Sequence, residues 1–325
     1  MKRRFLALAA IAAIASLATT TPARAQSYPA KPVKIVAPVQ PGGGVDMVAR
    51  TVAEQLSRSM NATFVVENLA GGGGVIASRT VANAPADGYT LMVGYVATHG
   101  TNPAVRKIPY DAIKDFTPVA MVGGTPNVLA VNASVPPRTL KDFVEYARAN
   151  AGKLSYGSAG QGSLTHLAME QFKVAAGFDA VHAAYRGIGP AITDLLGGQT
   201  QMMMPGLAAA LPHIKSGRMV PIAVTGARRH PLLPDVATFE ELGYHGFDGL
   251  QWYGIVGPAG MPPEITRLLN DEINKALTDP KLGERLSAEA LQPMPMAPDE
   301  FGRFMESDIA RWSKLAKERN IRLED

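Results

Sequence analysis

The sequence predicts an α/β protein of two lobes, each a sheet flanked by helices. After residue 25, short apolar runs with strand character alternate with segments of helical periodicity. The apolar runs are continuous, which is typical of strands covered on both faces, so largely parallel sheets are expected. Extended segments at 125–132 and 251–258 bracket a middle block. We interpret this block, 127–249, as a second lobe inserted into a first lobe made of 26–126 and 250–325.

The expected elements follow from these periodicities. Strands are predicted at 33–37, 63–66, 90–93, 128–131, 153–156, 181–184, 201–204, 221–225 and 251–256. Helices are predicted at 46–60, 140–150, 163–176, 188–196, 207–216, 264–278, 281–288 and 298–318.

Residues 1–25 have the pattern of a secretory signal peptide. A basic KRR stretch precedes an apolar run over 5–17 that is too short to span a bilayer, and a small-residue ARA motif ends at Ala25. Cleavage after Ala25 is expected to leave 26–325 as the mature protein in the periplasm.

Composition excludes several classes of function. Four of the 32 Lys and Arg residues and none of the 28 Asp and Glu residues lie in this leader, so the mature chain is balanced, 28 against 28. A balanced chain without a basic tract is not expected to bind nucleic acid. The absence of cysteine excludes disulfides, thiolate catalysis and cysteine metal sites.

Four glycine-containing turns follow predicted strands, at 40–46, 95–100, 157–166 and 185–191. Such turns can direct backbone N–H groups at an anion, at the sheet edge where α/β proteins bind ligands. None contains the Gly-Lys-Ser/Thr of a P-loop, and the chain has no GxSxG, no HExxH and no His pair at metal spacing. GGGVIA at 72–77 matches a dinucleotide pattern, which is weak by itself.

Individual residues of these turns allow two interpretations each. Ser163 can cap the following helix, leaving the N–H groups of Gly160 to Ser163 for an anion, or the segment is a plain glycine turn. His166 is either a packed histidine or the base of a hydrolase that uses Ser163. Asp46 either stabilises a helix start, which we favour, or contacts a ligand, and Arg186 either pairs with a carboxylate or lies on the surface.

Taken together, the segments resemble the periplasmic solute-binding receptors of tripartite tricarboxylate transporters, the Bug-type receptors. The similarity covers nearly the whole mature chain and rests on YPAKPVKIVAPVQPGGGVDMVAR (28–50), VVENLAGGGG (65–74), APADGYTLMVG (84–94), IPYDAIKDFTPVAMV (108–122), KLSYGSAGQGSLTHLAMEQF (153–172), YRGIGPAITDLLGGQTQ (185–201), LPHIKSGR (211–218) and LPDVATFEELG (233–243).

This resemblance implies a periplasmic-binding-protein-like fold, type II-like, whose lobes close on a small carboxylate in the interlobe cleft. It also implies delivery of that ligand to the membrane permease subunits of a transporter, without catalysis, cofactor or metal, and we expect a monomer. Together with Asp46 and Arg186, the positions that match the family define the candidate ligand-binding residues: Val39, Gln40, Gly42, Gly43, Val45, Asp46, Ala97, Thr98, His99, Gly160, Gln161, Gly162, Ser163, His166, Arg186, Pro205 and Gly206.

The chain departs from the family at several of these positions. Members commonly have an aromatic residue and Pro at Val39 and Gln40, Ser or Thr at Val45, and Asp-Asn at Pro205 and Gly206, which here follow three methionines. The change in polarity predicts a carboxylate with a larger apolar or aromatic remainder.

Two other functions remain open from the sequence: an exported serine hydrolase using Ser163 and His166, and a ligand sensor that serves a signalling partner.

Overall fold

The computed structural model describes residues 28–323. The chain divides into two units, Met1–Ala30 and Lys31–Asp325, and every helix and strand named below belongs to the second unit. The predicted signal peptide lies outside the described residues. No helix within 28–323 is long and apolar enough to cross a membrane.

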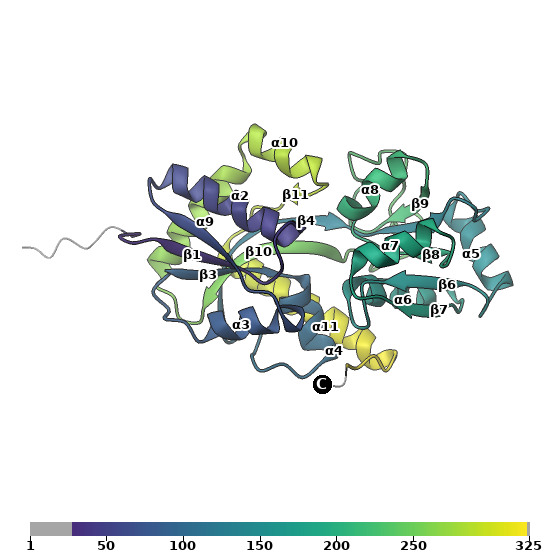
Figure 1. The fold of residues 1–325 in the computed structure, drawn as a ribbon, viewed down its shortest axis with the longest axis horizontal. Helices are drawn as coiled ribbons and strands as arrows, with labels where there is room; N and C mark the ends of the chain where they lie inside the picture. Colours follow the sequence, from purple (N-terminus) through teal and green to yellow (C-terminus); the bar gives the residue numbers. More distant parts are fainter. Residues whose placement is uncertain (1–27, 324–325) are drawn as a thin grey trace, which may run out of the picture. The chain divides into compact units, whose positions relative to one another are not determined.

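The first sheet has six strands in the order β11-β4-β10-β3-β1-β2. Its strands are β1 (Val33–Ala37), β2 (Phe64–Asn68), β3 (Thr90–Tyr95), β4 (Phe116–Pro126), β10 (Leu250–Pro258) and β11 (Gln292–Pro293). One face carries α2 (Gly44–Ser59), α9 (Pro263–Leu277) and α10 (Pro280–Ala288), and the other carries α3 (Val75–Ala82), α4 (Asn102–Val105) and α11 (Pro298–Glu318) (Figure 1).

The second sheet has five strands in the order β7-β6-β8-β5-β9. Its strands are β5 (Val128–Asn132), β6 (Ser155–Ser158), β7 (Val181–Ala184), β8 (Met202–Met203) and β9 (Met219–Val224). One core packs α5 (Leu140–Ala149) and α6 (Leu164–Ala176) against it, and a second core packs α7 (Ile188–Leu196) and α8 (Leu207–Lys215). We call each sheet with its helices a lobe.

The sheets are mixed, so the expectation of largely parallel sheets is wrong. Among the described strands, four pairings are parallel and five are antiparallel. The reason is the crossing between lobes (Figure 1). The chain leaves the first sheet through β4 and returns through β10, so these two neighbours run in opposite directions, as do β5 and β9.

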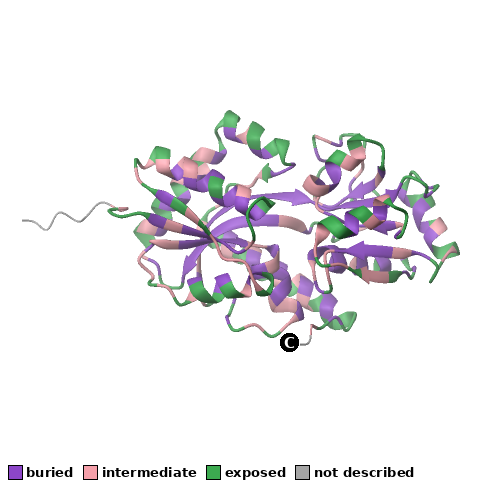
Figure 2. Ribbon diagram, viewed as in Figure 1, coloured by how far each residue is buried: buried purple, intermediate pink, exposed green. Residues whose placement is uncertain are grey.

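The apolar strands are covered on both faces, as their continuous hydrophobic sequences indicate. Every residue of β5 is buried, and Figure 2 shows buried strands between helices that are exposed on their outer side. The lobes also share packing away from the crossing. Leu164 and Leu167 of α6 belong to the core cluster of the first lobe, together with Trp312 of α11 and Ile321. The lobe boundaries predicted from the sequence remain a prediction.

Candidate functional site

A cavity of about 400 Å³ lies where elements of both lobes meet. The first lobe contributes α2, β4, β10 and the segment after α10, and the second contributes the β6–α6 turn, α7 and α8. The lining residues are Gly43, Gly44, Met47, Thr125, Ala159, Thr165, Ile188, Gly206, Ala208, Ala209, Gln251, Tyr253, Glu289 and Leu291. This volume is in the range of small-molecule sites.

Four helices begin at this cavity. Residues at the start of α2, α6, α7 and α8 line it, and the N-cap residues of α2, α7 and α8 are Gly43, Gly187 and Gly206, which offer no side-chain cap. The first N–H groups of a helix have no partner within the helix, and the helix dipole makes this end positive. The cavity therefore favours an anion without a lysine or arginine in its lining.

Three side chains from the crossing strands add polar groups. Thr125 of β4 is 2% exposed, and its Oγ1 makes no hydrogen bond within the described part of the chain. Gln251 pairs with Thr125 across β4 and β10. Burial raises the pKa of Tyr253, so its hydroxyl keeps its proton. A buried hydroxyl without a partner costs stability, and a ligand that supplies the partner recovers that cost.

The β1–α2 turn is held by Asp46. Its carboxylate accepts hydrogen bonds from Gly42 N–H (3.0 Å), Arg50 Nε (3.0 Å) and Asn68 Nδ2 (2.8 Å). The hydrogen bond from Arg50, supported by those from Asn68 and Gly42, outweighs burial and lowers the pKa of Asp46 to about 2. Its contacts are those of a carboxylate that braces the turn, which agrees with the interpretation we favoured.

The β6–α6 turn satisfies most of its own donors. Gly160 N–H donates to Ser158 Oγ (3.1 Å), Gly162 N–H to His166 Nδ1 (3.0 Å) and Ser163 N–H to the Gly160 carbonyl (3.2 Å). The expectation that this run of N–H groups is free for an anion is therefore wrong at these three positions, because the tight turn closes on itself. The predicted N-cap is present, since Ser163 Oγ accepts from His166 N–H (3.4 Å).

The Ser163 hydroxyl is not aligned with a base. It donates to the Gly160 carbonyl (2.6 Å) and lies 3.0 Å from Thr165 Oγ1, which accepts from Ala159 N–H (2.9 Å). Ala159 and Thr165 both line the cavity, so this small network shapes its wall. A Ser–His nucleophile would need a hydrogen bond from the serine hydroxyl to the ring of His166, and Nδ1 of that ring already accepts from Gly162.

His166 is a packed histidine. Its ring stacks on His182 with centroids 3.9 Å apart, and His182 stacks on Tyr156 at 4.8 Å. Nε2 of His182 lies 2.6 Å from Ser158 Oγ. Burial, and next the neighbouring His182, lower the pKa of His166 to about 4, so the ring is neutral near pH 7. The stack is tied to the β6–α6 turn, because His182 contacts Ser158 and His166 accepts from Gly162.

The remaining candidates divide by position. Gly43 and Gly206 line the cavity. The other candidates in the turns that precede α2, α6, α7 and α8 are close in sequence to residues that line it. In these turns Val39 accepts from Asn68 Nδ2 (3.1 Å), Pro205 is buried, and Gln40, Gln161 and Arg186 are exposed.

The structure does not bring 97–99 to the cavity. Thr98 and His99 are buried in the first lobe, in the short segment η2 (Ala97–Thr101), with the ring of His99 4.5 Å from that of Phe116.

The sequence missed Thr125, Gln251 and Tyr253. All three lie on β4 and β10, in the extended segments that mark the crossing between lobes. A signal was present, because the strands that join two lobes must pass the floor of the cleft between them.

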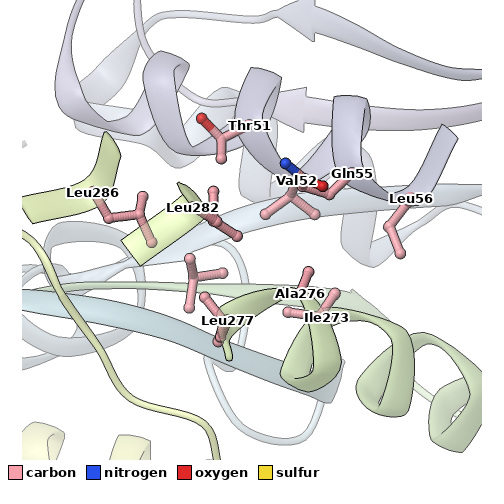
Figure 3. Close-up of a pocket in the computed structure, with 10 residues that line it drawn as sticks. Thr51, Val52, Gln55, Leu56, Ile273, Ala276, Leu277, Leu282 and Leu286 are labelled. Atoms are coloured by element: carbon pink, nitrogen blue, oxygen red, sulfur yellow. The ribbon is translucent and has the colours of Figure 1, made fainter. Parts of the chain in front are cut away.

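A second hollow is a packing gap. It measures about 10 Å³ and lies between α2, α9 and α10, where Figure 3 shows Val52, Leu56, Ile273 and Leu282 pointing toward one another. This space holds about one water and no solute. Within residues 28–323 no group of three or more His, Asp or Glu side chains is placed to hold a metal ion.

The fold and the site define a class: a two-lobe periplasmic solute-binding protein. A family model described as "Tripartite tricarboxylate transporter family receptor" matches residues 48–321, and the chain belongs to this family.

Individual relatives cover nearly the whole chain. Protein BugT of Bordetella pertussis is 34% identical over 93% of this chain and 93% of its own length. Among solved structures, R. palustris Rpa4515 with adipate is 35% identical (TM-score 0.81; 91% of this chain, 99% of that one). MatC of Rhodopseudomonas palustris with bound malate is 31% identical (TM-score 0.76; 89% and 99%).

Proposed function

We propose that this chain is a periplasmic receptor that captures a small carboxylate with an apolar remainder and delivers it to the permease subunits of its transporter. The observation that carries the proposal is the cavity where four helices from both lobes begin, with the buried, unpartnered hydroxyl of Thr125 in its wall. Relatives whose solved structures contain adipate and malate support an acid as the ligand.

The mechanism is binding followed by closure, with no reaction. Hydrogen bonds to a charged group contribute about 1.5–3 kcal/mol each, and burial of the apolar remainder adds to them, so that together they offset the costs of association. The ligand touches 26–126 and 250–325 on one side and 127–249 on the other, so it stabilises the closed arrangement. We propose these ranges as the lobes, a signal peptide over 1–25 and a monomeric mature protein.

The lining supports an apolar remainder. Besides the polar groups of the crossing strands and Glu289 at one end, the side chains in the walls include the apolar Met47, Ile188, Ala208, Ala209 and Leu291. Methionine and aliphatic side chains leave few partners for hydroxyl or amino groups on the ligand, whereas a hydrocarbon chain or ring gains from burial here.

The test is calorimetry with a panel of mono- and dicarboxylates on three proteins. Thr125→Val removes the hydroxyl at nearly constant shape and is expected to weaken binding of the best acid by about ten- to hundredfold. Thr125→Ser keeps the hydroxyl and is the matched control. Binding that Thr125→Val leaves unchanged, or a wild-type protein that binds none of the acids, would contradict the proposal. Saturating ligand should also reduce the radius of gyration in small-angle scattering.

A further inference from the structure

One end of the cavity is negative. Glu289 is the only charged side chain in the lining described above, and it forms no ion pair within residues 28–323. It is also the C-cap of α10, so it stands at the end of a helix where the dipole is negative. The other helices at the cavity present their positive N-termini. This end of the cavity therefore differs in sign from the rest.

The backbone that presents Glu289 is fixed in place. Leu291 N–H donates to the Leu286 carbonyl (2.9 Å) and Ala290 N–H to the Ser287 carbonyl (2.9 Å), the pattern of a Schellman helix end. Ala290 has φ 53°, a left-handed conformation that glycine usually supplies. Alanine stands here because its side chain is fully buried in a core of the second lobe, in the cluster that contains Leu207. The turn is thus anchored in both lobes.

The strand order places this negative end opposite the start of α2. Leu291 lies beside β4 at the β11 edge, since a Cβ on Gly123 would stand 3.3 Å from its Cγ. The start of α2 lies over β10, since a Cβ on Gly44 would stand 2.8 Å from the hydroxyl of Tyr253. The β11 edge and β10 are two strand spacings apart, roughly 10 Å. A short ligand whose acid lies at α2 therefore reaches toward Glu289 with its other end.

We propose that Glu289 selects against a second carboxylate, so that this receptor prefers monocarboxylates with an uncharged tail over dicarboxylates. The inference rests on the proposed function and specifies its ligand class. The Glu289 carboxylate and the C-terminus of α10 repel an anionic tail, and the cavity offers no lysine or arginine at that end to neutralise one. Leu291 beside them contacts a hydrocarbon tail favourably.

The experiment compares hexanoate and adipate, which share a six-carbon chain and differ in the charge of one end. Wild-type protein is expected to bind hexanoate at least roughly tenfold more tightly than adipate. Glu289→Gln is expected to narrow that ratio roughly three- to tenfold by strengthening adipate binding alone. Glu284→Gln, an exposed acid on α10 outside the cavity, is the matched control and should leave the ratio unchanged. Added salt should also narrow the ratio in wild-type protein but not in Glu289→Gln.

The possible results separate the two proposals. If both acids bind and their ratio is the same in wild type and Glu289→Gln, or if adipate binds wild type as tightly as hexanoate, this inference is overturned and the proposed function stands. If neither acid binds either protein, both are overturned. The melting temperature of each variant is expected to match that of wild type, because Glu289 and Glu284 are exposed. With equal melting temperatures, a change in the affinity ratio comes from the charge and not from a loss of folded protein.

Discussion

Asn127, directly after β4, and Thr225, directly after β9, link the outgoing chain to the returning chain. Asn127 N–H donates to Thr225 Oγ1 (2.9 Å), Thr225 N–H donates to the Asn127 carbonyl (2.8 Å), and Thr225 Oγ1 donates to the Gly249 carbonyl (2.7 Å). Both side chains are buried. The outgoing and returning chains therefore meet in one hydrogen-bonded joint next to Thr125 in the cavity wall.

Thr225→Val should loosen this joint. The valine keeps the shape but leaves the Asn127 N–H and the Gly249 carbonyl without partners, so the free energy of unfolding is expected to fall by about 1–3 kcal/mol. Urea denaturation measures it. Thr80→Val is the control, because Thr80 Oγ1 donates to the Ile76 carbonyl on an exposed face of α3. Equal losses in the two variants would mean that the joint has no special role.

The start of α2 should tolerate a side chain at one glycine and not at its neighbour. A Cβ on Gly44 would lie 2.8 Å from the hydroxyl of the buried Tyr253, whereas a Cβ on Gly43 meets nothing within 4 Å. Gly44→Ser is therefore expected to cost about 1–3 kcal/mol of unfolding free energy through overpacking. Gly43→Ser, at the N-cap, is expected to be neutral or slightly stabilising. The reverse order in urea denaturation would contradict the geometry.

Glu170 of α6, in the second lobe, is hydrogen-bonded to Arg319 at the end of α11, in the first lobe. Its carboxylate accepts from Lys173 Nζ (2.7 Å) and Tyr156 Oη (2.6 Å) within the second lobe, and from Arg319 Nη2 (2.8 Å) at the end of α11. Burial opposes its ionisation, but these hydrogen bonds outweigh burial and lower the pKa of Glu170 to about 2.

Glu170→Gln should therefore leave the buried Lys173 ammonium with the exposed Asp179, 3.1 Å away, as its remaining ion-pair partner, and cost about 2–4 kcal/mol in chemical denaturation. The control is Glu241→Gln, which breaks the exposed pair with Arg229 and is expected to cost less than about 1 kcal/mol. If Glu170→Gln costs no more than the control, the carboxylate does not hold the lobes together.

The buried histidines should make the protein sensitive to acid. The folded pKa of His166 is about 4, below its ordinary value of 6.5, so between these values the unfolded chain binds the proton more tightly. The contribution of neutral His166 to the free energy of unfolding is fully present above about pH 6.5 and is lost as the pH falls toward 4. His99, with a pKa lowered to about 3 by burial, acts in the same direction, whereas Asp308, raised to about 6 by burial, acts in the opposite one.

Comparing wild type with His166→Gln isolates the pH-dependent contribution of His166 to stability. The stability difference between them should shrink by about 1–3 kcal/mol from pH 7.5 to pH 4.5 in urea denaturation. A constant difference would show that His166 is not a neutral buried ring.

Local patterns were enough for much of the fold. The predicted helices at 188–196 and 298–318 coincide with α7 and α11, and the predicted strand at 33–37 coincides with β1. Ser163 caps α6 as predicted. These features depend on side chains within one or two turns, so a short window of sequence contains their cause.

β4 and the orientation of the crossing strands were not found. Residues 116–124 of β4 were not predicted as a strand, because FTPVAMVGGTP mixes apolar residues with proline and glycine. Antiparallel pairing with β10 stabilises this strand, and β10 begins more than a hundred residues later.

By itself the sequence determined the α/β class, the helix starts after glycine-rich turns and the membership of a receptor family. Only the tertiary structure decided which of those turns face one cavity, that Thr98 and His99 are buried in the first lobe, and that Thr125 and Glu289 lie in the cavity wall. The physical reason is the separation along the chain of the residues that interact. Helix starts and apolar runs follow from neighbouring residues, whereas a cavity forms where segments distant in the chain are brought together by burial and strand pairing.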